Sequence, residues 1–378
     1  MRGCIIKRGA KWAVVYDLAR DENGRRRRRW KGGFATKREA TAALTEIASR
    51  LQRGEYVEPS KQTLGVYLRE WLIGRQATIR PSTLASYRMN VESHLAPALG
   101  SVPLQALTAA TLNAFYSDML ADGRKHGRGG LSARTVRYTH MILRRALSDA
   151  VRQQLLVRNV ADSASPPRPR ATAAMKTWSG PELRAFLDST VSERFYAAFL
   201  LAATTGMRRG EVLGLHWRDL DLDAGRAAVT QTLIAVRGEL MFSTPKTAKG
   251  RRLVALDAFT VAALREHRRS QLVERLSLGP DYQDRDLVFC QENGEPVHPD
   301  RFSDLFDRMV KAAGLPRVRF HDLRHTHATL ALAAGVHPKV VSERLGHATV
   351  SITLDTYSHA LPAMQEEAAE RVAALVFA

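Results

Sequence analysis

The sequence predicts a mainly α-helical protein with small antiparallel β-sheets, arranged as three successive domains. The first shows the alternating pattern of strands followed by one amphipathic helix, and the second is helical in pattern almost throughout. The third mixes helices with short strands and follows a basic, proline-rich stretch. A chain of 378 residues has room for two or three domains of roughly 100–200 residues each. The predicted domains are 1–58, 63–162 and 176–378, with a linker at 163–175.

The predicted first domain is an α+β unit with three strands and one helix. Residues 11–17 alternate between apolar and polar side chains, which indicates a strand, and residues 21–24 have the composition of a hairpin turn. Residues 25–30 are predicted to form the returning strand, and residues 31–34 a third short strand. Residues 36–52 carry apolar side chains at helical spacing and are predicted to cover the sheet.

Positive charge is the main feature of the composition. The chain has 57 Lys and Arg against 38 Asp and Glu, a formal net charge of +19. Such a balance favours a polyanionic partner, nucleic acid first, although a ribosomal or membrane-surface protein is also basic. The run at residues 25–29 is either a solvated charge run or a localisation signal, or it lies on a sheet face against DNA. The alternation around it favours the DNA interpretation for Arg25, Arg26, Arg27, Arg28 and Arg29.

The predicted second domain is all-helical, and its helix at residues 133–153 has two distinct faces. The apolar face consists of Val136, Leu143, Leu147, Ala150 and Val151. The other face is basic, with Asp149 as the single acid at its border. A merely solvated face would show more acid–base pairing at helical spacing. The basic stripe is therefore predicted to follow DNA phosphates, through Arg134, Arg137, Arg144, Arg145 and Arg152.

The third domain is predicted to be mixed α/β. It begins with helices at residues 181–187 and 195–203, continues with strands at 227–236, 240–243 and 252–256, and is helical from there on. Residues 361–377 form an amphipathic helix that docks either on its own domain or on a neighbouring copy.

Several polar residues of this third domain stand where packing alone would not place them. Gly206 marks a helix entry, after which Arg208 and Glu211 are three residues apart and the carboxylate can hold the guanidinium outward, toward a phosphate. An ordinary helix-surface ion pair is the simpler interpretation. Lys246 lies on a basic turn between two strands, where a lysine is usually only solvated.

A histidine-rich segment follows at residues 320–330. His321, Arg324 and His325 share one helical face, and the two histidines have the spacing of a helical zinc site. Arg324 between them would repel a divalent cation, so no metal site is predicted. His347 follows a glycine at a helix end, and Tyr357 lies ten residues later on a polar segment.

The order of these residues resembles the tyrosine recombinase family, also called phage integrases. Arg208, Lys246, His321, Arg324, His347 and Tyr357 match the family's six catalytic positions in type and order, with Glu211 in support. The resemblance covers the whole chain. It implies an arm-type DNA-binding domain, a helical SAM-like core-binding domain and a tyrosine recombinase catalytic domain. The spacing from His347 to Tyr357 resembles that of integrases from phages and conjugative elements.

The resemblance also implies a reaction. Tyr357 would attack a DNA phosphate and leave a 3′-phosphotyrosine and a free 5′-hydroxyl, without a metal, ATP or other cofactor. Arg208, Arg324 and His347 would stabilise the transition state, and His321 would assist removal of the tyrosine proton. Lys246 would protonate the leaving oxygen. The implied partners are core and arm DNA sites, a homotetramer on DNA, a host DNA-bending protein and an excision factor.

Three other functions fit parts of the pattern. A type IB topoisomerase shares the chemistry but needs no arm-site or core-site specificity. A non-catalytic DNA-binding regulator on the same scaffold would have lost one or more of the six residues, and a metal-dependent nuclease would use the histidines as ligands. Only Cys4 and Cys290 occur, far apart, so no disulfide is predicted. Without a long apolar segment, the chain is expected to be cytoplasmic and nucleoid-associated when bound to DNA.

Overall fold

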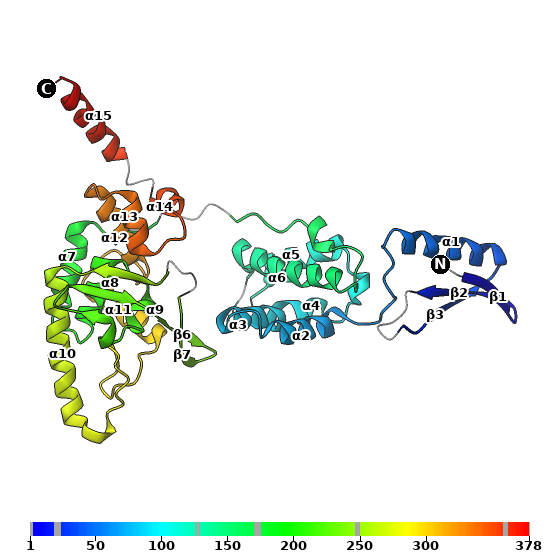
Figure 1. The fold of residues 1–378 in the computed structure, drawn as a ribbon, viewed down its shortest axis with the longest axis horizontal. Helices are drawn as coiled ribbons and strands as arrows, with labels where there is room; N and C mark the ends of the chain where they lie inside the picture. The colour runs from blue at the N-terminus through cyan, green and yellow to red at the C-terminus, as the bar shows by residue number, and fades with distance from the viewer. Residues whose placement is uncertain are drawn as a thin grey trace. The chain divides into compact units, whose positions relative to one another are not determined.

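The computed structural model describes residues 3–18, 24–124, 127, 129–169, 175–245, 250–357 and 362–377, with the side chains of 362–368 and 371 left out. The chain folds into two compact units, Met1–Ala171 and Thr172–Ala378 (Figure 1). Both are mainly helical with small antiparallel sheets, which confirms the predicted fold class. Among the helices of these described ranges, none is long and apolar enough to cross a membrane.

The first unit begins with an antiparallel sheet in the order β1-β2-β3, followed by α1. Apolar side chains of β2 and α1 form its core, with Val14, Tyr16, Ala40 and Ile47 buried. The side chain of Thr36 caps the helix by accepting a hydrogen bond from the backbone N–H of Glu39. The elements are β1 (Gly3–Arg8), β2 (Lys11–Leu18), β3 (Arg27–Phe34) and α1 (Lys37–Gln52).

The prediction of three strands is correct in number but wrong in position. The third strand is β1, ahead of β2, and residues 31–34 only continue β3. Gly33 adopts a positive φ of 98°, and the register shifts opposite it, between Trp12 and Val14. A glycine can take that conformation without strain, so the strand continues through a bulge. The predicted turn at 21–24 lies outside the described residues except for Gly24.

The rest of the first unit is a helical bundle with its own core, as predicted. Threonine and serine caps at Thr63, Thr108 and Ser132 begin three of its helices. The bundle contains α2 (Leu64–Arg75), α3 (Pro81–Asn90), a π-helical segment (Val91–Leu95), α4 (Ala96–Leu99), α5 (Ala109–Asp122) and α6 (Ala133–Arg152), with 3₁₀ segments at Leu104–Ala106 and Val160–Ser163. The predicted apolar face of α6 is buried, except that Val151 is half-buried.

Asp149 does not lie at the border of an exposed basic stripe, as the sequence suggested, but is buried at the α2–α6 contact. Its carboxylate accepts a hydrogen bond of 2.7 Å from the Trp71 indole N–H and pairs with Arg75 and Arg152. A buried carboxylate requires such donors, since desolvation without them is unfavourable. This acid therefore stabilises the packing of two helices.

The second unit has a core of aromatic and aliphatic side chains around α8, α9 and α11 (Figure 1). One sheet has the order β4-β5-β8, and β6 pairs with β7 in a separate hairpin. The elements are α7 (Gly180–Ser189), α8 (Tyr196–Thr205), α9 (Arg209–Leu213), a 3₁₀ segment (Trp217–Asp219), β4 (Leu220–Asp221), β5 (Arg226–Val229), β6 (Thr232–Val236), β7 (Glu239–Ser243), β8 (Arg252–Ala255), α10 (Ala258–Leu278), a 3₁₀ segment (Gly279–Asp281), α11 (Pro299–Ala312), α12 (Asp322–Ala333), α13 (Pro338–Leu345), α14 (Val350–Tyr357) and α15 (Pro362–Phe377).

The single strand predicted at 227–236 is in fact two strands in two different sheets. Gln231 lies at the break, where its side-chain amide donates to the carbonyl of Gly214 at 2.8 Å. The side chain of Thr230 donates to Asp219 at 3.1 Å. These side-chain hydrogen bonds replace ladder pairing at the junction and redirect the chain.

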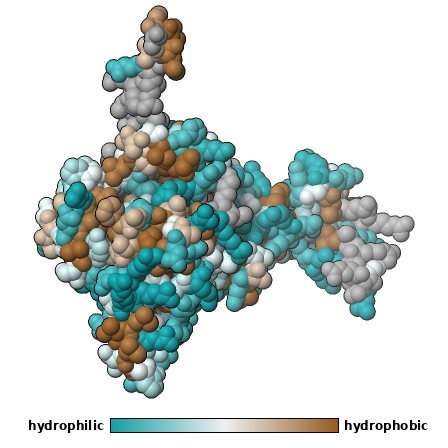
Figure 2. Space-filling model, turned by 60° about the vertical axis from the view of Figure 1, so that its left-hand side comes forward, coloured by the Kyte–Doolittle hydropathy of each residue, from teal (hydrophilic) through white to brown (hydrophobic). Residues whose placement is uncertain are grey.

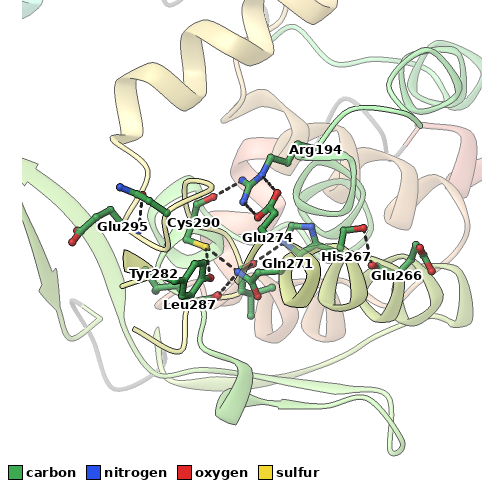
Figure 3. Close-up of polar contacts among 12 residues, drawn as sticks. Arg194, Glu266, His267, Gln271, Glu274, Tyr282, Leu287, Cys290 and Glu295 are labelled. Atoms are coloured by element: carbon green, nitrogen blue, oxygen red, sulfur yellow. Dashed lines mark hydrogen bonds and ion pairs between the residues drawn. The ribbon is translucent and has the colours of Figure 1, made fainter. Parts of the chain in front are cut away.

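A partly buried polar network joins α10 to Arg194, which precedes α8, and to the segment between α10 and α11 (Figure 3). Arg194 binds both carboxylate oxygens of Glu274 at 2.7 Å. Gln271 donates to the carbonyl of Leu287 at 3.0 Å and contacts the Cys290 sulfur at 2.9 Å. Cys290 is thus a buried structural thiol.

Apolar side chains are exposed at the end of α10 and on α15. Figure 2 shows hydrophobic atoms gathered at the lower end of the second unit, where Val273 and Leu276 are 64% and 82% exposed. Leu375 and Phe377 of α15 are each 87% exposed. An amphipathic helix with an exposed apolar face has the character of a docking element.

Candidate active site

A glycine in the left-handed backbone conformation ends α8, two residues before the first arginine of the site. Gly206 has φ 66° and caps the carboxyl end of α8, so the prediction that it marks a helix entry is wrong. The positive φ favours glycine, and a Cβ at this position would also lie 2.4 Å from Leu345 Cδ2, so that side chain would have to shift. The chain then places Arg208 at the N-cap of α9.

Glu211 holds two arginines from two elements. One carboxylate oxygen accepts from Arg208 Nη1 at 2.7 Å, and the other accepts from Arg252 Nη2 at 2.9 Å. The side chains of Glu211 and Arg252 are only 4% and 7% exposed. Burial alone would raise the pKa of Glu211, but the bonds and charges of Arg252 and Arg208 outweigh it and hold that pKa below its ordinary value. The predicted Arg208–Glu211 contact is present.

Arg252, the first residue of β8, points into the protein. Its Nε donates to the carbonyl of Arg344 at 2.7 Å, and its other nitrogens bind Glu211. Lys246 itself lies outside the described residues.

Arg324 is buried on α12 and is not fully bonded. Nη1 donates to the carbonyl of Gly206 at 2.8 Å, whereas Nη2 is buried and has no hydrogen-bond partner in the part of the chain that the structure describes. Burial, with repulsion from Arg208, lowers the pKa of Arg324 to about 9, which still leaves the guanidinium charged at neutral pH. A buried donor without a partner is unfavourable, and an anion would satisfy it.

Two of the predicted histidines lie at helix ends. His321 is the exposed N-cap residue of α12, and its ring meets the ring of His325 edge-on at 5.2 Å between centroids. His347 follows Gly346, which caps α13 in the left-handed conformation as predicted. His347 Nδ1 lies 2.8 Å from Thr353 Oγ1. Burial and the charges of Arg324 and Arg208 lower the pKa of His347 to about 4, so its ring is neutral at pH 7.

Tyr357 ends α14 and is fully buried, rather than exposed as an isolated tyrosine on a polar segment would be. Its Oη lies 2.8 Å from Nδ1 of His325, and its ring stacks at 6.5 Å on the ring of His347. Burial raises the pKa of Tyr357, whereas the charges of Arg324 and Arg208 lower it. The phenol therefore lies within the electrostatic field of both arginines.

The described part of the site thus brings together five of the six predicted residues and adds two that the sequence did not assign, Arg252 and His325. Within the described part of the chain, no three His, Cys, Asp or Glu side chains could hold a metal ion together. His325 could have been chosen from its place one turn after His321. Nothing in the sequence distinguishes Arg252 from its basic neighbours.

The arginine run of the first unit is paired with acids from two directions. Arg26 and Arg28 contact Asp17 at 2.5 Å and 3.6 Å, whereas Arg27 and Arg29 contact Glu58. The alternation of a strand explains this division, because neighbouring side chains point to opposite faces.

The arginines of α6 are exposed, and some of them also have partners. Arg144 pairs with Asp162 at 2.6 Å, and Arg152 pairs with Asp149. Arg145 donates to the hydroxyl of Tyr87 at 3.4 Å. The predicted scarcity of acidic partners along this stripe is therefore wrong for Arg144 and Arg152. Asp162 comes from outside the helix, and Asp149 lies three residues before Arg152.

Family models match most of the chain. Residues 179–364 match the phage integrase family, residues 5–51 an arm DNA-binding domain, and residues 63–120 the N-terminal SAM-like domain of phage integrases. The chain belongs to the phage integrase family. As a member it is a tyrosine-type site-specific recombinase.

Relatives and solved structures named as integrases or recombinases are similar to this chain over much of its length. A tyrosine recombinase XerC-like protein of Caldanaerobacter subterraneus is 28% identical over 97% of this chain and 96% of its own. The ICEBs1 integrase of Bacillus subtilis is 29% identical over 67% of this chain and 69% of its own.

In fold, the Tn1549 transposon integrase bound to transposon right-end DNA has a TM-score of 0.68 at 21% identity, covering 82% of this chain and 99% of that one. A lambda integrase dimer bound to a core site has a TM-score of 0.57 at 17% identity, covering 93% and 94%.

Proposed function

We propose that this integrase cuts and rejoins DNA through a covalent bond between Tyr357 and a 3′ phosphate. The observation that carries the proposal is the position of Tyr357. Its side chain is buried, and its hydroxyl is close enough to Arg208 and Arg324 for their charges to lower its pKa. A phenol and two guanidiniums are the groups that attack on a phosphodiester needs, one as nucleophile and two as ligands for the non-bridging oxygens.

Arg324 supplies the clearest phosphate ligand. Its buried Nη2 has no hydrogen-bond partner among the described residues, so a phosphate oxygen would complete its hydrogen bonding. Arg208 is 40% exposed and fixed by Glu211, which leaves part of its guanidinium facing outward. Negative charge that develops in the transition state would meet donors that are already positioned.

His347 acts as a neutral hydrogen-bond donor in this proposal. Its lowered pKa leaves one ring N–H at neutral pH. If the Thr353 hydroxyl donates to Nδ1, the proton of the ring is on Nε2, which is then free to donate to the phosphate. Thr353 is thus a positioning residue.

The leaving 5′ oxygen needs a proton, and the family resemblance assigns its transfer to Lys246. Tyr357 Oη bonds to phosphorus while the bond from phosphorus to the 5′ oxygen breaks, which yields a 3′-phosphotyrosine and a 5′-hydroxyl. Rejoining is the same step in reverse with a new 5′-hydroxyl. No cofactor enters this balance.

The remaining domains would select the DNA sites and bring four copies of the protein together on them. The domain matched as arm DNA-binding would bind arm sites, and the SAM-like helical domain would bind core sites, with four copies on the DNA. The exposed apolar side chains at the end of α15 suit docking on a neighbouring copy, which would couple the active sites. The names of the relatives favour a phage or conjugative element as the source, with a host DNA-bending protein and an excision factor as further partners.

Covalent trapping tests the proposal. A core site is first selected from random-sequence duplexes by repeated binding, and is then synthesised with a nick that lets the cleaved strand end diffuse away. The wild-type chain should form an adduct that survives denaturation, and Tyr357→Phe should form none. Recombination by the Phe variant would contradict the proposal. Cleavage abolished by a chelator would instead indicate a metal-dependent nuclease.

A second assay separates the recombinase from a topoisomerase of similar chemistry. Supercoiled plasmids with and without the selected site are compared at equal protein concentration. Only the plasmid that carries the site should be cut or recombined. Equal relaxation of both plasmids would favour the topoisomerase.

A further inference from the structure

The hydroxyl of Tyr357 is bonded to a histidine that lies outside the family's six positions. His325 Nδ1 and Tyr357 Oη are 2.8 Å apart, although the residues lie on α12 and α14 and are 32 positions apart in sequence. The ring centroids are 5.7 Å apart. Tyr357 is fully buried and His325 is partly buried, so water does not compete freely for this hydrogen bond.

His321, by contrast, does not reach this hydroxyl. It is exposed at the first turn of α12, and its ring packs edge-on against His325. Within the described residues, no hydrogen bond joins His321 to Tyr357. His325 therefore lies between the exposed histidine and the nucleophile.

We propose that His325 is a catalytic residue that takes the phenolic proton of Tyr357 when the DNA strand is cut. This proposal rests on the proposed covalent reaction and names its base. As Oη bonds to phosphorus, the proton of the phenol passes to Nδ1 of His325, and the bond from phosphorus to the 5′ oxygen breaks. The 5′ oxygen takes a separate proton from Lys246 or solvent. In rejoining, the imidazolium returns its proton to Oη as the phosphotyrosine bond breaks.

The charges around His325 suit both states of the ring. Burial lowers the pKa of His325, and Arg324 and Arg319 act in the same direction, so the resting ring is neutral and has one nitrogen free to accept. The carboxylate of Asp322, only 4% exposed, opposes them and would stabilise the imidazolium once it forms. Among the described residues, the other titratable groups near the ring are His321, His347 and Tyr357.

The tautomer of His325 can be measured without DNA. In nitrogen NMR of the full chain labelled at histidine, the His325 signals are assigned by their loss in His325→Asn. Nδ1 should show the shift of an unprotonated acceptor and should change in Tyr357→Phe, with the ring proton on Nε2. A proton on Nδ1 would make His325 the donor to the tyrosine oxygen and would overturn the proposal.

Cleavage kinetics then test the proton transfer. Asn at position 325 places an oxygen near the position of Nδ1, so it can hold the tyrosine but cannot take up its proton. On the nicked duplex described above, His325→Asn should form the adduct about 10²–10⁴-fold more slowly, with unchanged DNA binding. The wild-type rate should rise with pH through the range of His325, and this rise should be absent in His325→Asn. His321→Asn should keep it.

Two further variants complete the experiment. His337→Asn is the matched control, because this exposed histidine only caps α13 and asparagine caps equally well, so its rate should equal that of the wild type. If His325→Asn fails to fold, as judged by circular dichroism, His325→Ala is assayed with added imidazole, which should restore cleavage in proportion to its concentration.

The possible outcomes distinguish failure of the proposed covalent reaction from failure of His325 as its base. A wild-type chain that forms no adduct removes the proposed function and the base with it. If the wild type forms the adduct and His325→Asn cleaves at the wild-type rate or faster, only the role of His325 as the base is rejected. His325 would then only hold the hydroxyl of Tyr357 by a hydrogen bond. Loss of the pH-dependent rise in His321→Asn, with retention in His325→Asn, would transfer the role to His321.

Discussion

The carboxylate of Glu211 is predicted to be a main source of stability in the second unit. Glu211→Gln keeps the size of the side chain but removes the charge between Arg208 and Arg252. Arg252 is 7% exposed, so its guanidinium would lose its counter-charge without gaining water. Breaking a buried ion pair by removing one partner costs about 3–5 kcal/mol, and the remaining amide oxygen favours the lower end of that range.

A loss of about 3 kcal/mol should lower the melting temperature of a unit of this size by about 6–12 °C, as measured by scanning calorimetry of the full chain at pH 7. The matched control is Glu266→Gln, which alters a pair whose side chains are 67% and 74% exposed and should change stability by less than about 0.5 kcal/mol. Equal melting of Glu211→Gln and the control would refute the reasoning.

The effect should also depend on pH. Because the folded-state pKa of Glu211 is lowered, its contribution is complete above the ordinary carboxyl pKa and is lost as the pH falls through the folded value. The difference in stability between wild type and Glu211→Gln should therefore be constant near neutral pH and shrink below about pH 4.

Three further changes have defined outcomes. Asp149→Asn should destabilise the first unit by about 1–3 kcal/mol, because Trp71 and two arginines lose a buried charged acceptor; an unchanged urea midpoint would contradict this. Arg134→Ala and Arg137→Ala should each reduce the slope of log affinity against log salt for DNA by about 0.9 if they contact phosphates, as measured by fluorescence anisotropy; an unaltered slope would exclude them. Gly206→Ala should destabilise the second unit by more than about 1 kcal/mol and slow cleavage, whereas Gly238→Ala, also at positive φ but in open space, should leave cleavage unchanged.

The periodic and motif-based features of the fold could be predicted from the sequence. The apolar face of α6 is buried as its spacing indicates, and Gly346 caps the end of α13, as the glycine at the predicted helix end indicated. These features depend on neighbours within a few residues along the chain. Local periodicity is therefore sufficient to predict them.

The features that could not be predicted depend on partners far along the chain. Arg252 is 41 residues from Glu211, and His325 is 32 residues from Tyr357. A basic residue after a basic turn has the same local pattern whether it faces DNA or a buried carboxylate. Asp149 is similar, since its partner Trp71 is on another helix, 78 residues away.

The pairing of the arginine run with Asp17 and Glu58 changes what its charge can contribute to affinity. When an arginine without an acidic partner contacts a DNA phosphate, cations condensed on the DNA are released into solution, and this release favours binding. Here four of the five guanidiniums already form ion pairs with carboxylates. A DNA phosphate that binds one of them would therefore have to displace a carboxylate. The net gain for a random stretch of duplex is then small. If this run contacts DNA, a backbone that follows the spacing of the strand would displace both carboxylates together. The run would then select DNA by geometry as well as by charge.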